Sequence, residues 1–260
     1  MNNNLNITII QSDIIWENID KNLSDFTEKI KNIDHNTGLI VLPEMFTTGF
    51  SMKSKDLAEE TNGKGLKWMK QMAADKNCYI TGSMIMHEKN NYFNRLIWMK
   101  PDGKFSTYDK GHLFRMEKED MHYKKGKNKI IVKINEWRIC PLICYDLRFP
   151  VWSRNKGDYD ILIYIANWPE SRKEVWKKLL YARAIENQCY VIAVNRIGKD
   201  GTGISYSGDS MIIDPKGNKI SNTEPYKDNI ETVSISLDEL NDFRKAFPVG
   251  LDADNFEIIK

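Results

Sequence analysis

Short apolar runs rich in β-branched residues recur along the whole 260-residue chain. Several of them are apolar at nearly every position, which is typical of strands that are covered on both faces. The runs are Ile7–Ile10, Leu39–Leu42, Tyr79–Met86, Arg95–Met99, Ile130–Ile134, Ile139–Ile143, Ile161–Ile165, Tyr190–Asn195, Met211–Ile213 and Thr232–Leu237. A chain of this kind has to form sheets whose faces are protected from water.

Helical patterns separate several of these runs. Apolar residues at spacings of three and four predict one helix within Ile19–Ile33 and another within Gly65–Lys76. Ser171 and Glu174 have the spacing of a capping box, which predicts a helix that opens there and runs through Gln188. The mixture predicts an α/β (α+β) fold, a layered sandwich in which helices cover two packed sheets.

No linker rich in serine, glycine or proline interrupts the chain, and no internal repeat is visible. A chain of 260 residues can form one large core. We therefore expect one domain over residues 1–260, with the tail from about residue 240 to residue 260 packed on that domain or on a dimer partner.

The charge balance argues against several classes of partner. Lysine and arginine total 38 and aspartate and glutamate 36, a formal net charge of +2. Neither nucleic acid nor an anionic membrane is therefore expected as a partner. No apolar run approaches the roughly 20 residues that span a bilayer. Residues 1–4 lack the basic start and apolar stretch of a signal peptide, which favours a cytoplasmic location.

The four cysteines are Cys78, Cys140, Cys144 and Cys189. Disulfides are not expected in a reducing compartment. The spacing between Cys140 and Cys144 is not a standard zinc spacing, and no histidine pair completes a ligand set. We expect no metal site.

One of these cysteines stands where a strand gives way to a turn. The run Ile139–Ile143 leads into Cys144, and the polar residues Asp146 and Arg148 follow at once. A strand cysteine is usually a buried structural thiol, but this position at the strand end favours a nucleophilic sulfur in a cleft. The amide of Tyr145 is then placed to help hold an oxyanion.

Two further strand ends carry charged residues. Glu44 follows the run Leu39–Leu42, and Lys110 follows the short alternating segment Phe105–Asp109. A partly desolvated carboxylate can act as a base near neutral pH, whereas a protonated lysine can hold that carboxylate and donate to an oxyanion. Taken singly, Glu44 is read more simply as a solvated acid and Lys110 as a surface lysine.

A papain-like enzyme would need a histidine beside its cysteine. The candidates are His35, His87, His112 and His122, of which His112 and His122 flank the Lys110 segment. No local papain-type signature is present. The Cys–His alternative therefore stays open at the level of sequence.

The strand-end residues Glu44, Lys110 and Cys144, in this order, resemble the catalytic set of the nitrilase, or carbon–nitrogen hydrolase, superfamily. Each matching motif is loose alone, but the ordered set is specific and covers nearly the whole chain. The matching segments are Leu42–Phe46, Tyr108–Phe114, Ile143–Pro150, Ala166–Pro169, Ala182–Gln188 and Tyr206–Ser210. Within the superfamily the chain is most similar to the bacterial omega-amidases, on the stretches Cys144–Asn155 and Phe247–Asp254.

This resemblance implies a four-layer α-β-β-α sandwich of mixed sheets that forms a homodimer across helices. It also implies hydrolysis of the terminal amide of 2-oxoglutaramate or 2-oxosuccinamate to the oxo acid and ammonia, through a cysteine thioester and without a cofactor. Cys144 would be the nucleophile and Glu44 the general base, while Lys110 and the Tyr145 amide would stabilise the oxyanion. A second glutamate follows the lysine in the superfamily; Glu119 is the expected one, and Glu117 is the alternative.

Substrates of this class carry a carboxylate at the far end, which calls for a cation in the pocket. Arg148 and Arg115 are the candidates, although a structural salt bridge is at least as good an interpretation of each. Trp168 and Phe46 are expected to form pocket walls, as is the Tyr145 ring. Aromatic residues of this kind pack in cores more often than they touch ligands.

Two rival functions remain. An N-carbamoyl amidohydrolase, an aliphatic amidase or a nitrilase would share the same catalytic set, so Glu44, Lys110 and Cys144 do not separate them. A non-catalytic binding protein on this fold would be expected to have lost one of the three residues, and all three are present.

Overall fold

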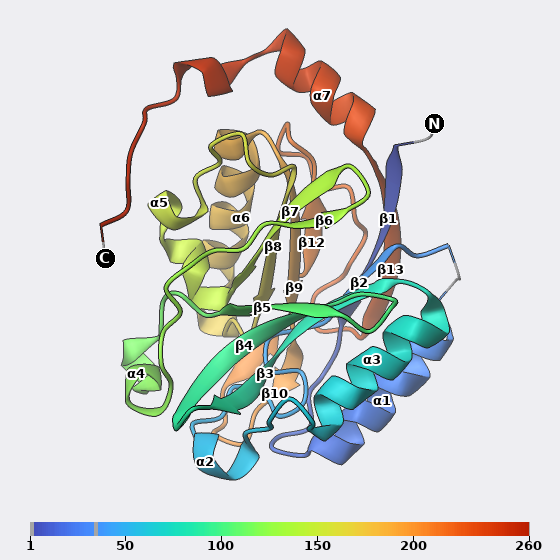
Figure 1. Cartoon of the computed structure of the whole chain (residues 1–260), viewed down its shortest axis with the longest axis vertical. Helices are drawn as coiled ribbons and strands as arrows, with labels where there is room; N and C mark the ends of the chain where they lie inside the picture. The colour runs from blue at the N-terminus through green and yellow to red at the C-terminus, as the bar shows by residue number, and fades with distance from the viewer. Residues whose placement is uncertain (1–2, 34–35, 260) are drawn as a thin grey trace.

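The computed structural model describes residues 3–33 and 36–259, and their arrangement is shown in Figure 1. The first sheet has six strands in the order β13-β1-β2-β3-β4-β5. Its strands are β1 (Asn4–Gln11), β2 (Leu39–Val41), β3 (Tyr79–Glu88), β4 (Asn91–Met99), β5 (Phe105–Asp109) and β13 (Asn229–Ser236). The sheet is mixed, because β1, β2 and β3 run parallel whereas β13, β4 and β5 pair antiparallel with their neighbours.

The second sheet has five strands in the order β12-β9-β8-β7-β6. Its strands are β6 (Val132–Ile134), β7 (Trp137–Ile143), β8 (Ile161–Ala166), β9 (Tyr190–Asn195) and β12 (Met211–Ile213). The three central strands are parallel, so their carboxyl ends lie at the same edge of the sheet. A separate hairpin pairs β10 (Ile197–Lys199) with β11 (Ser205–Ser207).

The longer helices lie on the outer faces of the sheets. The α-helices are α1 (Ile19–Lys31), α2 (Ser54–Leu57), α3 (Lys64–Lys76), α4 (Glu119–His122), α5 (Pro150–Ser153), α6 (Lys173–Asn187) and α7 (Leu237–Ala246). Four 3-10 helices join them: η1 (Arg115–Glu117), η2 (Cys144–Arg148), η3 (Glu170–Arg172) and η4 (Val249–Asp252).

Successive side chains of a strand point to opposite faces of its sheet, and this alternation explains how the layers pack. In β2, Leu39 and Val41 face the core between the two sheets, whereas Ile40 faces a second core beneath α1 and α3. On the far side, Trp176 and Leu180 of α6 pack on the second sheet. The predicted four-layer sandwich of two mixed sheets with helices outside is therefore confirmed (Figure 1).

Each predicted strand segment contains part of an observed strand, but one helix prediction and one strand prediction need correction. The predicted capping box at Ser171 does not form, because Ser171 lies within η3 and α6 begins only at Lys173. The predicted strand Thr232–Leu237 ends at Ser236, whose side chain caps α7 instead.

Within the described residues, none of the helices combines the length and the apolar composition that crossing a membrane requires. The tail beyond α7 passes outside α5 and α6, as Figure 1 shows. Arg244 fixes its start through Asp160 (2.7 Å), and Gln188 donates to the Phe247 carbonyl (2.8 Å). Farther along, the Lys156 ammonium lies 4.2 Å from the centre of the Phe256 ring.

Candidate active site

Cys144 occupies a sharp turn at the carboxyl end of β7. Its φ of 43° lies in the left-handed region, where a residue with a side chain is strained. The side chain of Asp146 fixes this turn by accepting the Ile143 N–H (3.1 Å) and the Tyr108 hydroxyl (2.7 Å). Strain held in place by buried hydrogen bonds is typical of functional turns, and here it raises the Cys144 side chain above the strand end.

A histidine helps to hold this turn rather than to serve the thiol. His112 contacts Asp146 Oδ1 through its backbone N–H (2.9 Å) and its Nδ1 (2.8 Å), and its ring stacks on Phe149 with centroids 3.8 Å apart. His35 lies outside the described residues. Of the histidines that the structure describes, none lines the pocket that contains Cys144, so the Cys–His alternative gains no support.

Glu44 lies just beyond the carboxyl end of β2 and is completely buried. Its Oε1 accepts from the Asn94 amide (2.7 Å) and from Lys110 Nζ (2.9 Å), and its Oε2 accepts the Asn167 N–H (2.7 Å). The Asn167 side chain also donates to the Glu44 carbonyl (2.6 Å). Both carboxylate oxygens therefore have fixed partners.

Lys110, at the end of β5, bridges two carboxylates. Its Nζ lies 2.9 Å from Glu44 Oε1 and 3.0 Å from each carboxylate oxygen of Glu119. The Phe114 N–H donates to Glu119 Oε2, and the Asn94 amide lies 3.4 Å from Glu119 Oε1. We call Glu44, Asn94, Lys110 and Glu119 the buried cluster; no member is more than 1% exposed.

Burial and the neighbouring charges determine whether Lys110, Glu119 and Cys144 are protonated before a substrate binds. Burial alone would lower the pKa of Lys110, but the attraction of Glu119 and Glu44 outweighs it and raises that pKa, so the ammonium stays charged. Burial raises the pKa of Glu119. Burial and the neighbouring Glu44 carboxylate raise the pKa of the Cys144 thiol well above its usual range. Cys144 is therefore a protonated thiol, and a thiol of this kind acts as a nucleophile only when a base takes its proton.

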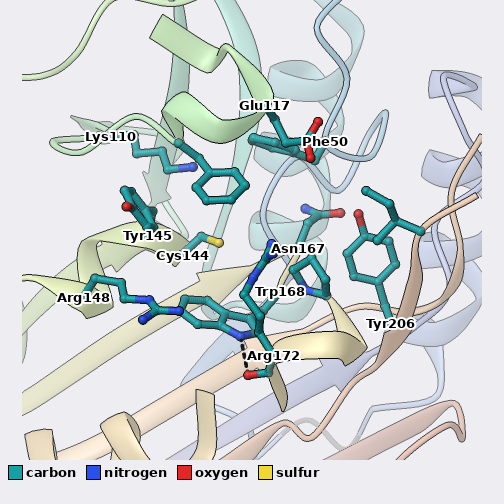
Figure 2. A pocket seen from close by; sticks show the side chains of 13 residues that line it. Phe50, Lys110, Glu117, Cys144, Tyr145, Arg148, Asn167, Trp168, Arg172 and Tyr206 are labelled. Carbon is teal, nitrogen blue, oxygen red and sulfur yellow. Dashed lines mark hydrogen bonds between the residues drawn. The ribbon is translucent and has the colours of Figure 1, made fainter. Parts of the chain in front are cut away.

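The pocket that contains Cys144 is bordered by residues that follow strands of both sheets, such as Lys110 and Asn167, and by the loop before α4. Figure 2 shows Lys110, Cys144 and Tyr145 on one side of it and Asn167 and Tyr206 on the other. Among the described residues, no group of three or more His, Cys, Asp or Glu side chains is placed to hold a metal ion.

The profile of the carbon–nitrogen hydrolase family matches residues 6–245. This chain belongs to the carbon–nitrogen hydrolase family. It is 43% identical to the omega-amidase YafV of Escherichia coli K12 over 98% of each chain, and 32% identical to a 2-oxoglutaramate amidase of Bacillus subtilis over 94% of this chain and 95% of that one. A crystal structure of the family protein XC1258 from Xanthomonas campestris, with an arsenic adduct in its active site, superposes with a TM-score of 0.95 at 39% identity, covering 98% of this chain and 99% of that one.

In this hydrolase most of the predicted site residues converge. Tyr145, Arg148 and Trp168 line the pocket together with Lys110 and Cys144. Tyr145 is the second residue of η2, where a helix leaves its first N–H groups without a partner in the helix. Glu119 rather than Glu117 contacts Lys110, whereas Glu117 is exposed at the pocket mouth.

Two predicted pocket residues lie elsewhere. Phe46 is fully buried in the core beneath α1 and α3, 5.7 Å from the Phe26 ring, and Phe50 lines the pocket in its place. Arg115 is 86% exposed beside Asp120 and does not line the pocket. The turn after Glu44 sends Phe46 to the helix side of the sheet, and η1 turns Arg115 out to solvent.

Sequence reasoning gave no role to Asn94, Asn167 or Arg172. Asn94 is an amide within the strand β4 and is completely buried; a polar side chain inside an apolar run is a weak signal that it has buried partners. Arg172 lines the pocket from η3. The sequence around Arg172 gives no such signal, because Arg172 is not inside an apolar run. It lies among exposed and half-buried residues at the start of α6.

Proposed function

We propose that this hydrolase is an omega-amidase that releases ammonia from the terminal amide of 2-oxoglutaramate or 2-oxosuccinamate. One observation carries the proposal: the cysteine at the strained end of β7 shares its pocket with an ammonium that bridges two buried carboxylates. The names of the Escherichia coli and Bacillus subtilis relatives, an omega-amidase and a 2-oxoglutaramate amidase, support this choice of substrate.

The first half-reaction forms a thioester. Glu44 takes the Cys144 proton while the sulfur adds to the amide carbon, and the carbonyl oxygen becomes an oxyanion held by Lys110 and the Tyr145 N–H. Glu44 then gives its proton to the amide nitrogen, the carbon–nitrogen bond breaks, and ammonia leaves. Over this half-reaction Glu44 accepts one proton and donates one, so it ends as the carboxylate with which it began.

The second half-reaction restores the enzyme. Glu44 takes a proton from a water molecule as its oxygen adds to the thioester carbon, and the oxyanion returns to the same two donors. The carbon–sulfur bond then breaks and the sulfur regains a proton, leaving the oxo diacid. Glu119 does not exchange protons in this scheme; it holds the Lys110 ammonium in place. No cofactor or metal takes part.

Steady-state ammonia release tests this proposal. 2-Oxoglutaramate is compared with an N-carbamoyl amino acid, a simple aliphatic amide and a nitrile, using the wild type, Cys144→Ala and the control Cys140→Ala from the same strand. We expect release from 2-oxoglutaramate that Cys144→Ala abolishes and Cys140→Ala retains. Turnover of the carbamoyl compound with none for 2-oxoglutaramate would assign another substrate class, and full activity of Cys144→Ala would remove the thioester mechanism.

Thiol labelling gives an independent check. Cys78, Cys140 and Cys189 are buried outside the pocket, whereas Cys144 lines it. We expect iodoacetamide to modify Cys144 first, and 2-oxoglutaramate to protect it. Equal labelling of all four cysteines would instead favour a non-catalytic protein.

We further propose a cytoplasmic, single-domain protein that forms a homodimer across α5, α6 and the tail. Large apolar side chains are exposed on this face: Val151 is 55% exposed, Ile185 56%, Phe247 61% and Leu251 85%. Covering such side chains is a common role of a subunit interface. Light scattering of the wild type and of Leu251→Asp measures this directly; a monomeric wild type contradicts the dimer.

A further inference from the structure

The proposed substrates are anions, and the buried cluster does not favour an anion. Two carboxylates, Glu44 and Glu119, face the single ammonium of Lys110, which leaves a formal excess of negative charge. A substrate carboxylate therefore needs cations elsewhere in the pocket. Of the residues that line it, Arg148 and Arg172 are the only other basic ones in the part of the chain that the structure describes.

Neither guanidinium group has a carboxylate partner among the residues that the structure describes. Most arginines of this chain form an ion pair: Arg95, Arg115, Arg138, Arg183, Arg196 and Arg244. Over residues 3–33 and 36–259, Arg148 and Arg172 form none. An unpaired arginine at a pocket wall is a site for an anionic ligand, because its planar fork matches a carboxylate.

Each of the two side chains is held by an aromatic ring of the same pocket. The Arg148 guanidinium lies 5.4 Å from the Trp168 ring centre, and the Arg172 guanidinium lies 5.1 Å from the Phe114 ring centre. The Trp168 indole also donates to the Arg172 carbonyl (2.9 Å). These contacts hold both cations while leaving their N–H groups to a ligand, which lowers the cost of ordering them when the ligand binds.

The two arginines reach the pocket from neighbouring strands. Arg148 ends η2 after β7, and Arg172 ends η3 after β8, which is paired in parallel with β7. Figure 2 shows Arg148 beside the Trp168 indole and Arg172 extending past that indole toward the middle of the pocket. The carboxyl ends of adjacent parallel strands thus carry the nucleophile and both cations.

We propose that Arg172 determines substrate specificity by binding, together with Arg148, the carboxylate of the 2-oxo acid. This rests on the proposed omega-amidase function for the identity of the acid. Arg148 and Arg172, the arginine pair, select amides that carry an anion at the far end, while the buried cluster acts on the amide end. Arg172 is a binding residue here and takes no part in proton transfer.

Kinetics on a charged and a neutral amide test this proposal. The wild type, Arg172→Gln, Arg172→Lys and the control Lys178→Gln, an exposed residue of α6, are assayed with 2-oxoglutaramate and with pentanamide, a neutral amide. For Arg172→Gln we expect kcat/KM to fall roughly 30-fold for 2-oxoglutaramate, the scale of one lost charge-assisted hydrogen bond, and to change less than about twofold for pentanamide. Arg172→Lys should recover part of the loss, and Lys178→Gln should match the wild type.

A binding measurement separates this proposal from the proposed function. Calorimetry with 2-oxopentanoate, which has the oxo acid group but no amide, needs no turnover. We expect binding to the wild type and a roughly 30-fold higher Kd for Arg172→Gln. A wild type that binds 2-oxopentanoate through Arg172 but does not hydrolyse 2-oxoglutaramate would sink the proposed function alone.

Three results overturn the role of Arg172. They are the absence of 2-oxopentanoate binding to the wild type, an unchanged Kd in Arg172→Gln, and an equal loss of activity on charged and neutral amides. The last would mean that the side chain only supports the pocket wall. Because the Trp168 indole bonds to the backbone carbonyl of Arg172, the substitutions keep that contact, and thermal melting verifies that each variant is folded.

Discussion

The buried cluster and the arginine pair border one pocket, yet their charges are held in opposite ways. In the buried cluster, Lys110 and its two carboxylate partners are at most 1% exposed, and each oxygen accepts a hydrogen bond. In the arginine pair, Arg148 is exposed, Arg172 is half-buried, and neither forms an ion pair with a described carboxylate. Charges that stabilise a transition state work best when they are fixed and desolvated. Charges that select a ligand have to be left unpaired until it arrives.

Removing the Lys110 cation of the buried cluster should lower activity and stability more than any other substitution in the buried cluster or at the pocket mouth. In Lys110→Gln, the oxyanion loses one of its two donors and the carboxylates of Glu44 and Glu119 lose their shared partner. We expect kcat to fall by about 10³-fold and the free energy of unfolding to fall by ~3 kcal/mol, measured by ammonia release and by urea denaturation.

Lys104→Gln is the matched control for this change. Lys104 is 81% exposed, and its ion pair with Asp102 spans 3.6 Å, so its loss should cost under about 0.5 kcal/mol. Equal effects of the two substitutions would contradict the idea that burial gives the Lys110 ion pairs their importance.

The second-largest loss of activity is expected at Asn94, which positions the Glu44 carboxylate. The side-chain NH₂ of Asn94 donates to Glu44 (2.7 Å) and lies 3.4 Å from Glu119, and its backbone carbonyl accepts the backbone N–H of Lys110 (3.0 Å). Asn94→Ala should lower kcat by roughly 30-fold while KM changes little, and should cost ~2 kcal/mol of stability because buried Glu44 loses a donor. A change confined to KM, or an equal effect of Asn91→Ala at the start of the same strand, would refute the positioning role.

Glu119 gives a prediction that depends on pH. Because burial raises its pKa, the folded protein binds the Glu119 proton more tightly than the unfolded chain does. The contribution of this proton to the free energy of unfolding is fully present below pH 4.5, the ordinary pKa of glutamate. It is lost as the pH rises through the raised pKa of Glu119 in the folded state. The stability of the wild type relative to Glu119→Gln should therefore decline from pH 4.5 upward, by about 1.4 kcal/mol for each unit by which the pKa is raised.

Urea denaturation of both proteins across this pH range measures the difference. Glu28→Gln serves as the control, since the Glu28 side chain is 69% exposed and its removal should leave the pH profile parallel to that of the wild type. The prediction is wrong if the stability of the wild type relative to Glu119→Gln stays constant or increases with pH. Burial would then not disfavour the charged form of Glu119.

The smallest effect is expected at the pocket mouth. Glu117 is exposed and is not hydrogen-bonded to Lys110. Glu117→Gln should leave kcat within about twofold and lower KM for an anionic amide slightly, because a screened like charge is removed. A larger loss of kcat in Glu117→Gln than in Glu119→Gln would exchange the roles of the two glutamates.

Two serine–glutamate pairs show what the sequence can and cannot predict. Ser171 and Glu174, and likewise Ser236 and Glu239, have the spacing of a capping box. Only Ser236 caps a helix, accepting the Glu239 N–H (3.3 Å), because η3 occupies the residues around Ser171. Local spacing identifies a possible cap, but the path of the preceding residues decides whether it forms.

The same limit applies to the site. The strand ends that carry Glu44, Lys110 and Cys144 could be predicted, because apolar runs and the polar residues after them are local signals. The partners of these residues could not, since Asn94 meets Glu44 across 50 positions and Asn167 meets it across 123. Those contacts depend on the pairing and docking of the sheets, which the spacing of residues does not specify.

The proposed nucleophile and the proposed base belong to different sheets. Glu44 and Lys110 follow β2 and β5, whereas Cys144 follows β7. During synthesis the amino-terminal half therefore emerges with an acid and an ammonium but no sulfur between them. A growing chain cannot attack cellular amides until residues beyond β7 have emerged and come to rest against the earlier strands. The site is therefore complete only when both sheets have formed and packed together, so an unfinished chain does not present the Cys144 thiol beside the Glu44 carboxylate.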